Sequence, residues 1–157
     1  MTESPTMSSP GVRIPPPFFF ALGLIAGYLL SRVGPPLLFG SGSSSDAGIA
    51  LIVVGASFAA WGMLTFRAAR TAINPTRSAS RIVTAGPYRF TRNPMYVGLT
   101  TVYLGSSLLI GTWWCIILLP VVLALLVRFV IRREEAYLDA AFHDDYAAYR
   151  GHVRRWV

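Results

Sequence analysis

The longest uncharged stretch of the chain runs from residue 93 to residue 127. As one helix it would extend roughly 50 Å at ~1.5 Å per residue, whereas the hydrocarbon core of a bilayer is only about 30 Å thick. The stretch therefore has to turn back on itself, and Gly111-Thr112 is the natural place for the turn. We predict two antiparallel helices, over 94–110 and 113–131.

Two earlier apolar blocks add further helices to this hairpin. Residues 47–66 carry no charge and are long enough to span a bilayer. The block 18–30 is shorter, and it spans only if the helix continues to Val33 while Arg32 reaches the interface. Only 13% of the chain is charged and 54% is hydrophobic, whereas about a quarter of a soluble domain is charged. A soluble globular fold is therefore excluded.

The basic residues set the expected topology. All fourteen are arginine and, against seven acids, they give a net charge of +7. Most of them lie in two clusters, 67–92 and 128–155, beside apolar blocks, and this placement favours a membrane flank over nucleic-acid binding. The positive-inside rule puts both clusters and both termini in the cytoplasm. We therefore expect a multi-pass integral membrane protein, placed in the bacterial inner membrane.

These patterns define the expected fold class and its parts. We predict an all-α polytopic membrane protein with about four transmembrane helices, the last two forming a hairpin, followed by a cytoplasmic amphipathic helix at the C-terminus. The parts are a disordered arm (1–17), two transmembrane helices (18–66) and a core (67–157). Cys115 is the single cysteine of the chain, so neither a disulfide framework nor a cysteine-rich metal site is expected.

Chemistry-bearing residues gather in two polar segments that flank the predicted hairpin. The first reads IVTAGPYRFTRNPMYVG (82–98) and the second EEAYLDAAFHDDYAAY (134–149). Because a hairpin brings the start of one helix near the end of the other, the two segments are expected to share one pocket at the membrane surface. Each also has a simpler interpretation. Asn93-Pro94 is a typical helix start, and Glu134-Glu135 is typical of a solvated helix face.

These two segments, in this order and at this spacing, resemble the isoprenylcysteine carboxyl methyltransferase and phospholipid methyltransferase family of integral membrane enzymes. The resemblance covers roughly residues 80–156, and the N-terminal half shares only its apolar character. It implies S-adenosylmethionine as methyl donor, with S-adenosylhomocysteine as product, bound at the cytoplasmic mouth of the hairpin.

The resemblance also implies which residues form the site. The predicted catalytic residues are Glu134 and Asn93, and Asn93 is assigned to binding because an amide does not titrate near neutral pH, whereas many relatives carry histidine there. The predicted donor-binding residues are Ser80, Arg81, Ile82, Val83, Tyr88, Asn93, Pro94, Met95, Tyr96, Glu134 and Glu135. The predicted acceptor-binding residues are Arg128, Arg132 and Tyr146, and no metal site is expected.

These residues leave the identity of the methyl acceptor open. A prenylcysteine-like carboxylate, a phospholipid amine, a prenylated peptide and a small hydrophobic molecule all fit a site that opens sideways to membrane lipids. The position that matches a substrate-contacting arginine in the farnesyl-cysteine enzymes falls near Val130, which weakens the case for prenylcysteine. Two other functions remain as alternatives, namely an NADPH-dependent membrane reductase of the sterol reductase type and a non-catalytic lipid-binding module.

Overall fold

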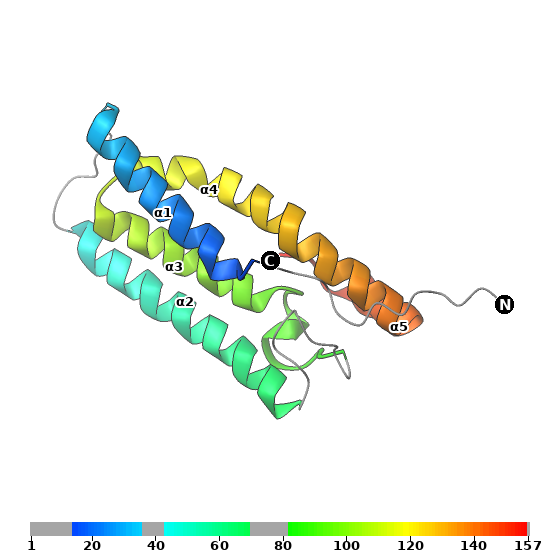
Figure 1. The fold of residues 1–157 in the computed structure, drawn as a ribbon. Coiled ribbons are helices and arrows are strands. Elements are labelled where there is room, and N and C mark those ends of the chain that lie inside the picture. Colours follow the sequence, from blue (N-terminus) through cyan, green and yellow to red (C-terminus); the bar gives the residue numbers. More distant parts are fainter. Residues whose placement is uncertain (1–13, 36–42, 70–81, 157) are drawn as a thin grey trace.

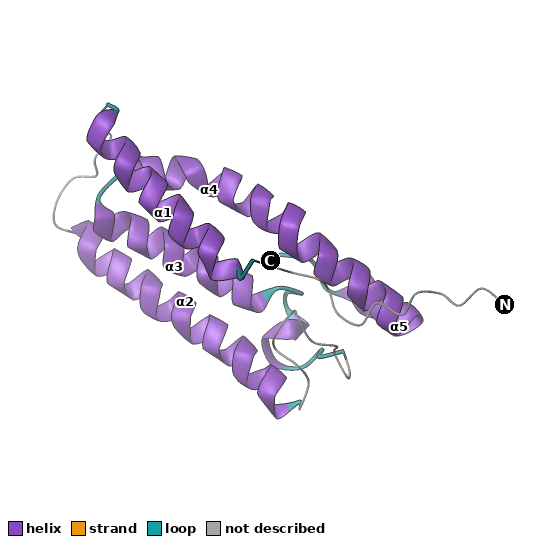
Figure 2. Cartoon of the chain, in the orientation of Figure 1, coloured by secondary structure: helices purple, strands orange, loops and turns teal. Residues whose placement is uncertain are grey.

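The computed structural model describes residues 14–35, 43–69 and 82–156, and within these ranges the chain is helical with no strand (Figure 2). The elements in chain order are α1 (Pro16–Val33), α2 (Ser43–Ala68), the 3-10 turn η1 (Gly86–Arg89), α3 (Pro94–Ile110), α4 (Trp113–Leu126), the π-helical turn η2 (Val127–Ile131) and α5 (Arg132–His152). The predicted all-α polytopic architecture is confirmed.

The predicted hairpin turn at Gly111-Thr112 is also confirmed. Gly111 ends α3 with a φ of 79°, a left-handed conformation that glycine adopts at little cost. Thr112 then caps α4, because its side chain accepts a hydrogen bond from the backbone N–H of Trp114. The predicted span 94–110 coincides with α3, whereas the bounds of α1 and α2 differ by a few residues from those predicted. In particular, α1 begins at Pro16 inside the segment taken as a disordered arm, because proline is well tolerated in the first turn of a helix.

Glycines allow the helices to pack with their backbones close together. A Cβ atom added at Gly55 of α2 would lie 2.6 Å from the carbonyl oxygen of Gly98 in α3, and one at Gly105 would lie 2.5 Å from that of Gly48. In α1, Gly23 and Gly27 form a G-x-x-x-G pattern that lies against Val122 and Cys115 of α4. Small residues commonly permit such close approach of membrane helices.

The bundle therefore consists of two tight pairs, α2 with α3 and α1 with α4 (Figure 1). Although α3 and α4 are joined by a short turn, they pack on each other less than α4 packs on α1. Tyr103 bridges the pairs, since its hydroxyl donates a 2.6 Å hydrogen bond to the carbonyl oxygen of Cys115. The predicted hairpin thus exists, but its two helices are splayed.

Beyond α4 the chain continues through η2 into α5 without a break, and it then reverses direction at His143, whose φ of 38° and ψ of −109° are not helical. The second half of α5 runs back toward the bundle and is followed by Val153–Trp156, which we call the C-terminal strap. Figure 1 shows α5 projecting beyond the end of the bundle. The predicted C-terminal helix is present, but the sequence did not indicate its bend.

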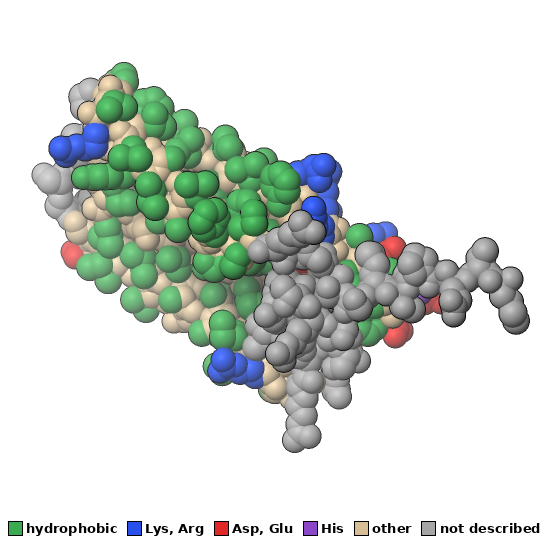
Figure 3. Space-filling model, viewed as in Figure 1, with side chains coloured by type: hydrophobic (Ala, Val, Ile, Leu, Met, Phe, Trp, Pro, Cys, Tyr) green, Lys and Arg blue, Asp and Glu red, His purple; other side chains and the backbone are tan. Residues whose placement is uncertain are grey.

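The outer surface of the bundle is suited to lipid. Three helical stretches are long and apolar enough to cross a membrane, namely Pro16–Val33, Ser45–Ala68 and Trp113–His152, and α3 is a shorter apolar helix. Hydrophobic side chains cover the face of the bundle drawn in Figure 3, and charged side chains gather toward its ends. Exposed leucine, valine and isoleucine side chains on α1, α2 and α4 are therefore expected to face acyl chains.

Candidate functional site

The two polar segments meet at one end of the bundle, which we call the polar end. The hydroxyl of Tyr96, in the first turn of α3, donates a 2.7 Å hydrogen bond to Oε1 of Glu134, at the start of α5. These residues are 38 positions apart in the sequence. The predicted juxtaposition of the two segments is therefore present in the structure.

The turn η1 is fixed from two sides. Gly86, which begins it, has a φ of 58°, and a Cβ atom at this position would lie 2.7 Å from Oγ1 of Thr65 in α2. The ring of Tyr88 meets the edge of Phe66 at a centroid distance of 4.9 Å, and the carbonyl oxygen of Tyr88 accepts a 2.8 Å hydrogen bond from Tyr149. The returning half of α5 thus covers the turn.

Tyr88 has a buried hydroxyl without a hydrogen-bond partner in the part of the chain that the structure describes. Only 4% of the residue is exposed, and its hydroxyl makes no hydrogen bond within the described part of the chain. Burial raises the pKa of Tyr88, and the nearby Tyr149 and Glu134 raise it further, so the hydroxyl keeps its proton. Because an unpaired buried donor is costly, this hydroxyl is suited to donate a hydrogen bond to a ligand.

The C-terminal strap ties the two polar segments together. The carbonyl oxygen of Arg154 accepts a 2.9 Å hydrogen bond from the backbone N–H of Arg92. The next carbonyl, of Arg155, accepts hydrogen bonds from Nδ2 of Asn93 at 2.9 Å and from Oγ1 of Thr91 at 3.2 Å. The strap therefore lies along the residues that lead into α3.

Glu135 is enclosed by positive charge. The guanidinium of Arg155 donates to both of its carboxylate oxygens, at 2.9 and 2.6 Å, and Nη1 of Arg92 lies 3.2 Å from Oε1. The hydrogen bond to Glu135 raises the pKa of Arg155 above its ordinary value. Two guanidiniums thus compensate one carboxylate, which leaves Glu135 little capacity for a further cation.

Glu134 has a different environment. Its one hydrogen bond from a side chain in the described ranges comes from the neutral hydroxyl of Tyr96, and it forms no ion pair with a described residue. A largely enclosed carboxylate without a cationic partner is well placed to attract a cation from a ligand. Of the two glutamates predicted to bind the donor, Glu135 is thus compensated, and Glu134, which was also predicted to be catalytic, is not.

The remaining predicted donor-site residues vary in how far they are buried. Val83 and Pro94 are buried, and Ile82 and Met95 are partly buried, whereas Ser80 and Arg81 lie outside the described residues. Asn93 occupies the N-cap position of α3, but its side chain makes no capping hydrogen bond. Its amide nitrogen instead donates to the carbonyl oxygen of Arg155, so Asn93 anchors the strap.

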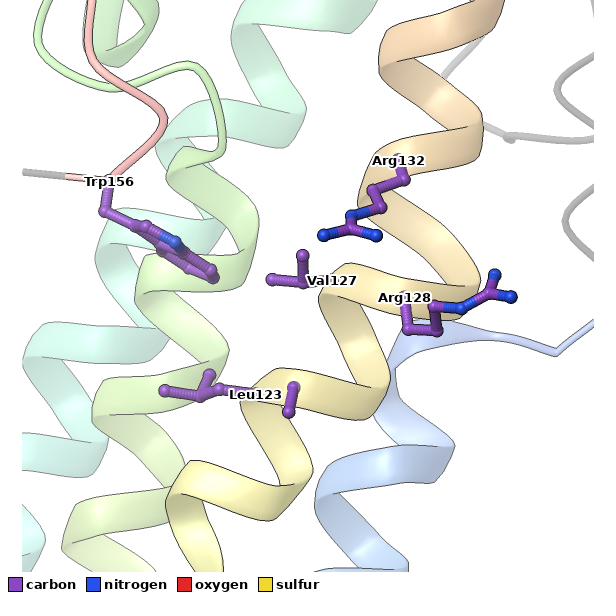
Figure 4. Close-up of a pocket in the computed structure, with 6 residues that line it drawn as sticks. Leu123, Val127, Arg128, Arg132 and Trp156 are labelled. Atoms are coloured by element: carbon purple, nitrogen blue, oxygen red, sulfur yellow. The ribbon is translucent and has the colours of Figure 1, made fainter.

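A separate cavity of about 430 Å³ lies on the α4 side of the polar end, which we call the α4 groove. It is lined by Leu123, Ala124, Val127, Arg128, Arg132 and Trp156. Figure 4 shows the indole of Trp156 facing Val127 across it, with the guanidinium of Arg132 above Val127. Two of the three predicted acceptor-site residues therefore line one cavity. Tyr146 does not line it, since this buried residue accepts a hydrogen bond from Arg92 through its hydroxyl.

The sequence of this chain matches a known protein family. The sequence model of a family described as phospholipid methyltransferase matches residues 45–145, which include most of α2, all of η1, α3, α4 and η2, and most of α5. The chain belongs to the phospholipid methyltransferase family. The predicted family resemblance is confirmed.

Two known proteins are similar to part of this sequence. One is the protein-S-isoprenylcysteine O-methyltransferase of Schizosaccharomyces pombe, 39% identical over 72 residues that cover 46% of this chain and 30% of the yeast protein. The other is an uncharacterized protein of Haemophilus influenzae, 38% identical over 66 residues that cover 40% of this chain and all of that protein. The match to the yeast enzyme thus spans less than a third of its length.

The strap was not predicted from the sequence. Thr91, Arg155 and Trp156 have clear structural roles, yet none of them is among the predicted site residues. The sequence offered one signal, a tryptophan directly after paired arginines at the end of a polar helix, but such a tail is equally typical of a membrane flank. Within the described ranges, no group of three or more histidine, cysteine or acidic residues could hold a metal ion.

Proposed function

We propose that this chain transfers a methyl group from S-adenosylmethionine to a lipophilic acceptor at the polar end of the bundle. The observation that carries the proposal is the hydrogen bond between Tyr96 and Glu134, because it joins the two polar segments around one enclosed carboxylate. Family membership supports the same reaction class, and the yeast relative is named for methylating an isoprenylcysteine.

The described residues suit the donor by their chemistry. Glu134 is an uncompensated carboxylate that would pair with the donor's ammonium group or its ribose hydroxyls. The unpartnered hydroxyl of Tyr88 would donate to an acceptor atom of the donor, and Ile82 and Val83 offer apolar contact for an adenine ring. Glu135 and Asn93 instead hold the strap, so we assign them positioning roles.

When bound, S-adenosylmethionine supplies a methyl carbon on a sulfonium, and the acceptor's lone pair forms the new bond as the C–S bond breaks to leave S-adenosylhomocysteine. The chain's own contribution is to align the two reactants and to exclude water. A carboxylate acceptor requires no general base, whereas an ammonium acceptor must first lose a proton. In this proposal Asn93 transfers no proton.

The acceptor is expected to enter from the bilayer through the α4 groove, which carries Arg128 and Arg132. Within this proposal a prenylcysteine-like carboxylate, a phospholipid amine and a small hydrophobic molecule remain the acceptor classes. The arginine-rich flanks favour a cytoplasmic polar end, and the proposed compartment is the bacterial inner membrane.

Isothermal titration of the purified protein with S-adenosylhomocysteine tests the donor site. We expect binding by the native chain and a loss of at least tenfold in affinity for Glu134→Ala, with Asp139→Ala as the matched control on the same helix. Equal affinity in native chain and Glu134→Ala would remove Glu134 from the site. Protection against thermal unfolding by NADPH, but not by S-adenosylhomocysteine, would favour a reductase instead.

A further inference from the structure

The strap delivers its last described residue, Trp156, to a defined place. Three sets of contacts hold the strap. They are the backbone hydrogen bond between Arg92 and Arg154, the hydrogen bonds from Thr91 and Asn93 to the carbonyl of Arg155, and the two-point contact of the Arg155 guanidinium with Glu135. Because all of them lie within two residues of Trp156, the position of the indole depends on the residues that lead into α3 and on Glu135, the direct neighbour of Glu134.

The indole forms a wall of the α4 groove. Trp156 lines the cavity together with residues of α4, η2 and the start of α5, and it also packs against the core cluster that contains Tyr96 and Leu126. Every other residue that lines the groove comes from the continuous helical stretch 113–152. Trp156 is therefore the one lining residue, among those described, that belongs to a non-helical segment.

The chemistry of the groove indicates one kind of occupant. Leu123, Ala124 and Val127 make its floor apolar, and Arg132 directs its guanidinium toward Val127 (Figure 4). The Arg128 guanidinium points away from Trp156 and lies over the ring of Phe129. Neither arginine forms an ion pair with a carboxylate in the described ranges. A cavity of about 430 Å³ lies within the range that small-molecule sites occupy. An amphiphile with one apolar chain and an anionic head complements this surface in shape and charge.

We propose that Trp156 is the specificity-determining residue of the α4 groove, which takes a single-chain anionic amphiphile as the methyl acceptor and selects it by the girth of its chain. This inference rests on the proposed function, because it treats the occupant as the acceptor. The indole faces Val127 across the groove (Figure 4), so a chain with methyl branches would meet the indole where a straight chain would pass.

The test compares two probes that differ in girth, hexadecanoate and its tetramethyl-branched counterpart, phytanate. Affinities are measured by titration into nanodiscs of zwitterionic lipid that hold the native chain, Trp156→Ala, Trp156→Phe or the control Trp113→Ala, with empty nanodiscs subtracted. We expect Trp156→Ala to raise the affinity for phytanate relative to hexadecanoate about tenfold, because a pocket discriminates by roughly this factor for each small apolar group. Trp156→Phe should fall between, and Trp113→Ala should leave the ratio unchanged.

A second arm tests the charge of the occupant and separates this inference from the proposed function. Hexadecanol should bind the native chain at least tenfold more weakly than hexadecanoate, and the double variant Arg128→Gln/Arg132→Gln should remove that difference. An affinity ratio that stays within twofold across the Trp156 variants would overturn the inference. Titration of the same samples with S-adenosylhomocysteine reports on the donor site alone, so a chain that selects amphiphiles but does not bind this ligand would refute the proposed function.

Discussion

At the polar end, the side next to the C-terminal strap and the side next to the turn η1 differ in how their glutamate is compensated. On the strap side, Glu135 is held by the guanidiniums of Arg92 and Arg155. On the turn side, Glu134 receives a hydrogen bond from the neutral Tyr96, and the hydroxyl of Tyr88 has no partner among the described residues. Adjacent glutamates in the sequence thus have compensated and uncompensated environments.

This difference separates structural from ligand-binding residues. A carboxylate between two guanidiniums joins segments and stabilises the fold, because removal of one member leaves partly buried charge uncompensated. A carboxylate and a hydroxyl that lack strong partners contribute little to the empty fold and are available to a ligand. Substitutions on the strap side should therefore reduce stability, and those on the turn side should reduce binding.

The largest effect is expected from Glu135→Ala. Only 16% of the Glu135 side chain and 11% of that of Arg92 are exposed, so the substitution leaves Arg92 without its counter-ion in a largely enclosed place. We expect a loss of about 2–4 kcal/mol in the free energy of unfolding, or a fall in Tm of roughly 5 to 15 °C. Thermal unfolding in detergent measures it, and a fall below about 2 °C would contradict the structural role of this pair.

Glu134→Gln should act on binding instead. The free energy of unfolding should change by less than about 1 kcal/mol, because the amide can still accept the hydrogen bond of Tyr96. The affinity for S-adenosylmethionine should fall about 10- to 100-fold, since a hydrogen bond to a charged group contributes about 1.5–3 kcal/mol. Titration with both the donor and S-adenosylhomocysteine shows which group of the donor lies near Glu134. Equal losses place Glu134 near the ammonium or ribose, and a larger loss for the donor places it near the sulfonium.

Tyr88→Phe and Tyr149→Phe form a matched pair with smaller effects. The first removes a buried hydroxyl that has no hydrogen-bond partner among the described residues, so the empty protein should keep its stability or gain up to about 1 kcal/mol. The second removes a 2.8 Å hydrogen bond to the carbonyl of Tyr88 and should cost about 1 kcal/mol. Urea or thermal unfolding of both variants measures the difference, and equal destabilisation would show that the Tyr88 hydroxyl is already satisfied.

The smallest effect is expected from Asp139→Ala, which removes the ion pair with Arg150. The two charged groups are 3.8 Å apart and more than half exposed, so solvent screens their attraction. We expect a change of less than about 0.5 kcal/mol in the free energy of unfolding, measured in the same thermal scans as Glu135→Ala. A larger change would mean that the bend of α5 depends on this pair.

The helical hairpin and the meeting of the two polar segments could be predicted from the sequence. An uncharged stretch too long for one span forces a turn, and Gly111-Thr112 supplies it with a left-handed glycine and a capping threonine. The predicted span 94–110 coincides with α3. These features follow from local composition and from the thickness of a bilayer, both of which are visible without coordinates.

The partners of the individual side chains could not be predicted in the same way. Glu134 and Glu135 are identical in residue type and adjacent, and what distinguishes them is a strap that returns only because α5 reverses at His143. A histidine with a positive φ has no sequence signature, since the surrounding packing imposes that conformation. The paired glycines of α2 and α3 did have a signal, an interval of seven residues in both helices, but its use requires knowing which helices are neighbours.

The π-helical turn over Val127–Ile131 sets the direction around the helix axis in which the side chains at the start of α5 point. One surplus residue in a helix rotates the downstream part by roughly 100°, since an α-helix has about 3.6 residues per turn. Deletion of one residue from this turn would therefore swing both glutamates around the helix axis and away from α3, while the hydropathy of the chain would hardly change. A relative with a shortened turn would look the same in composition and would have lost the site.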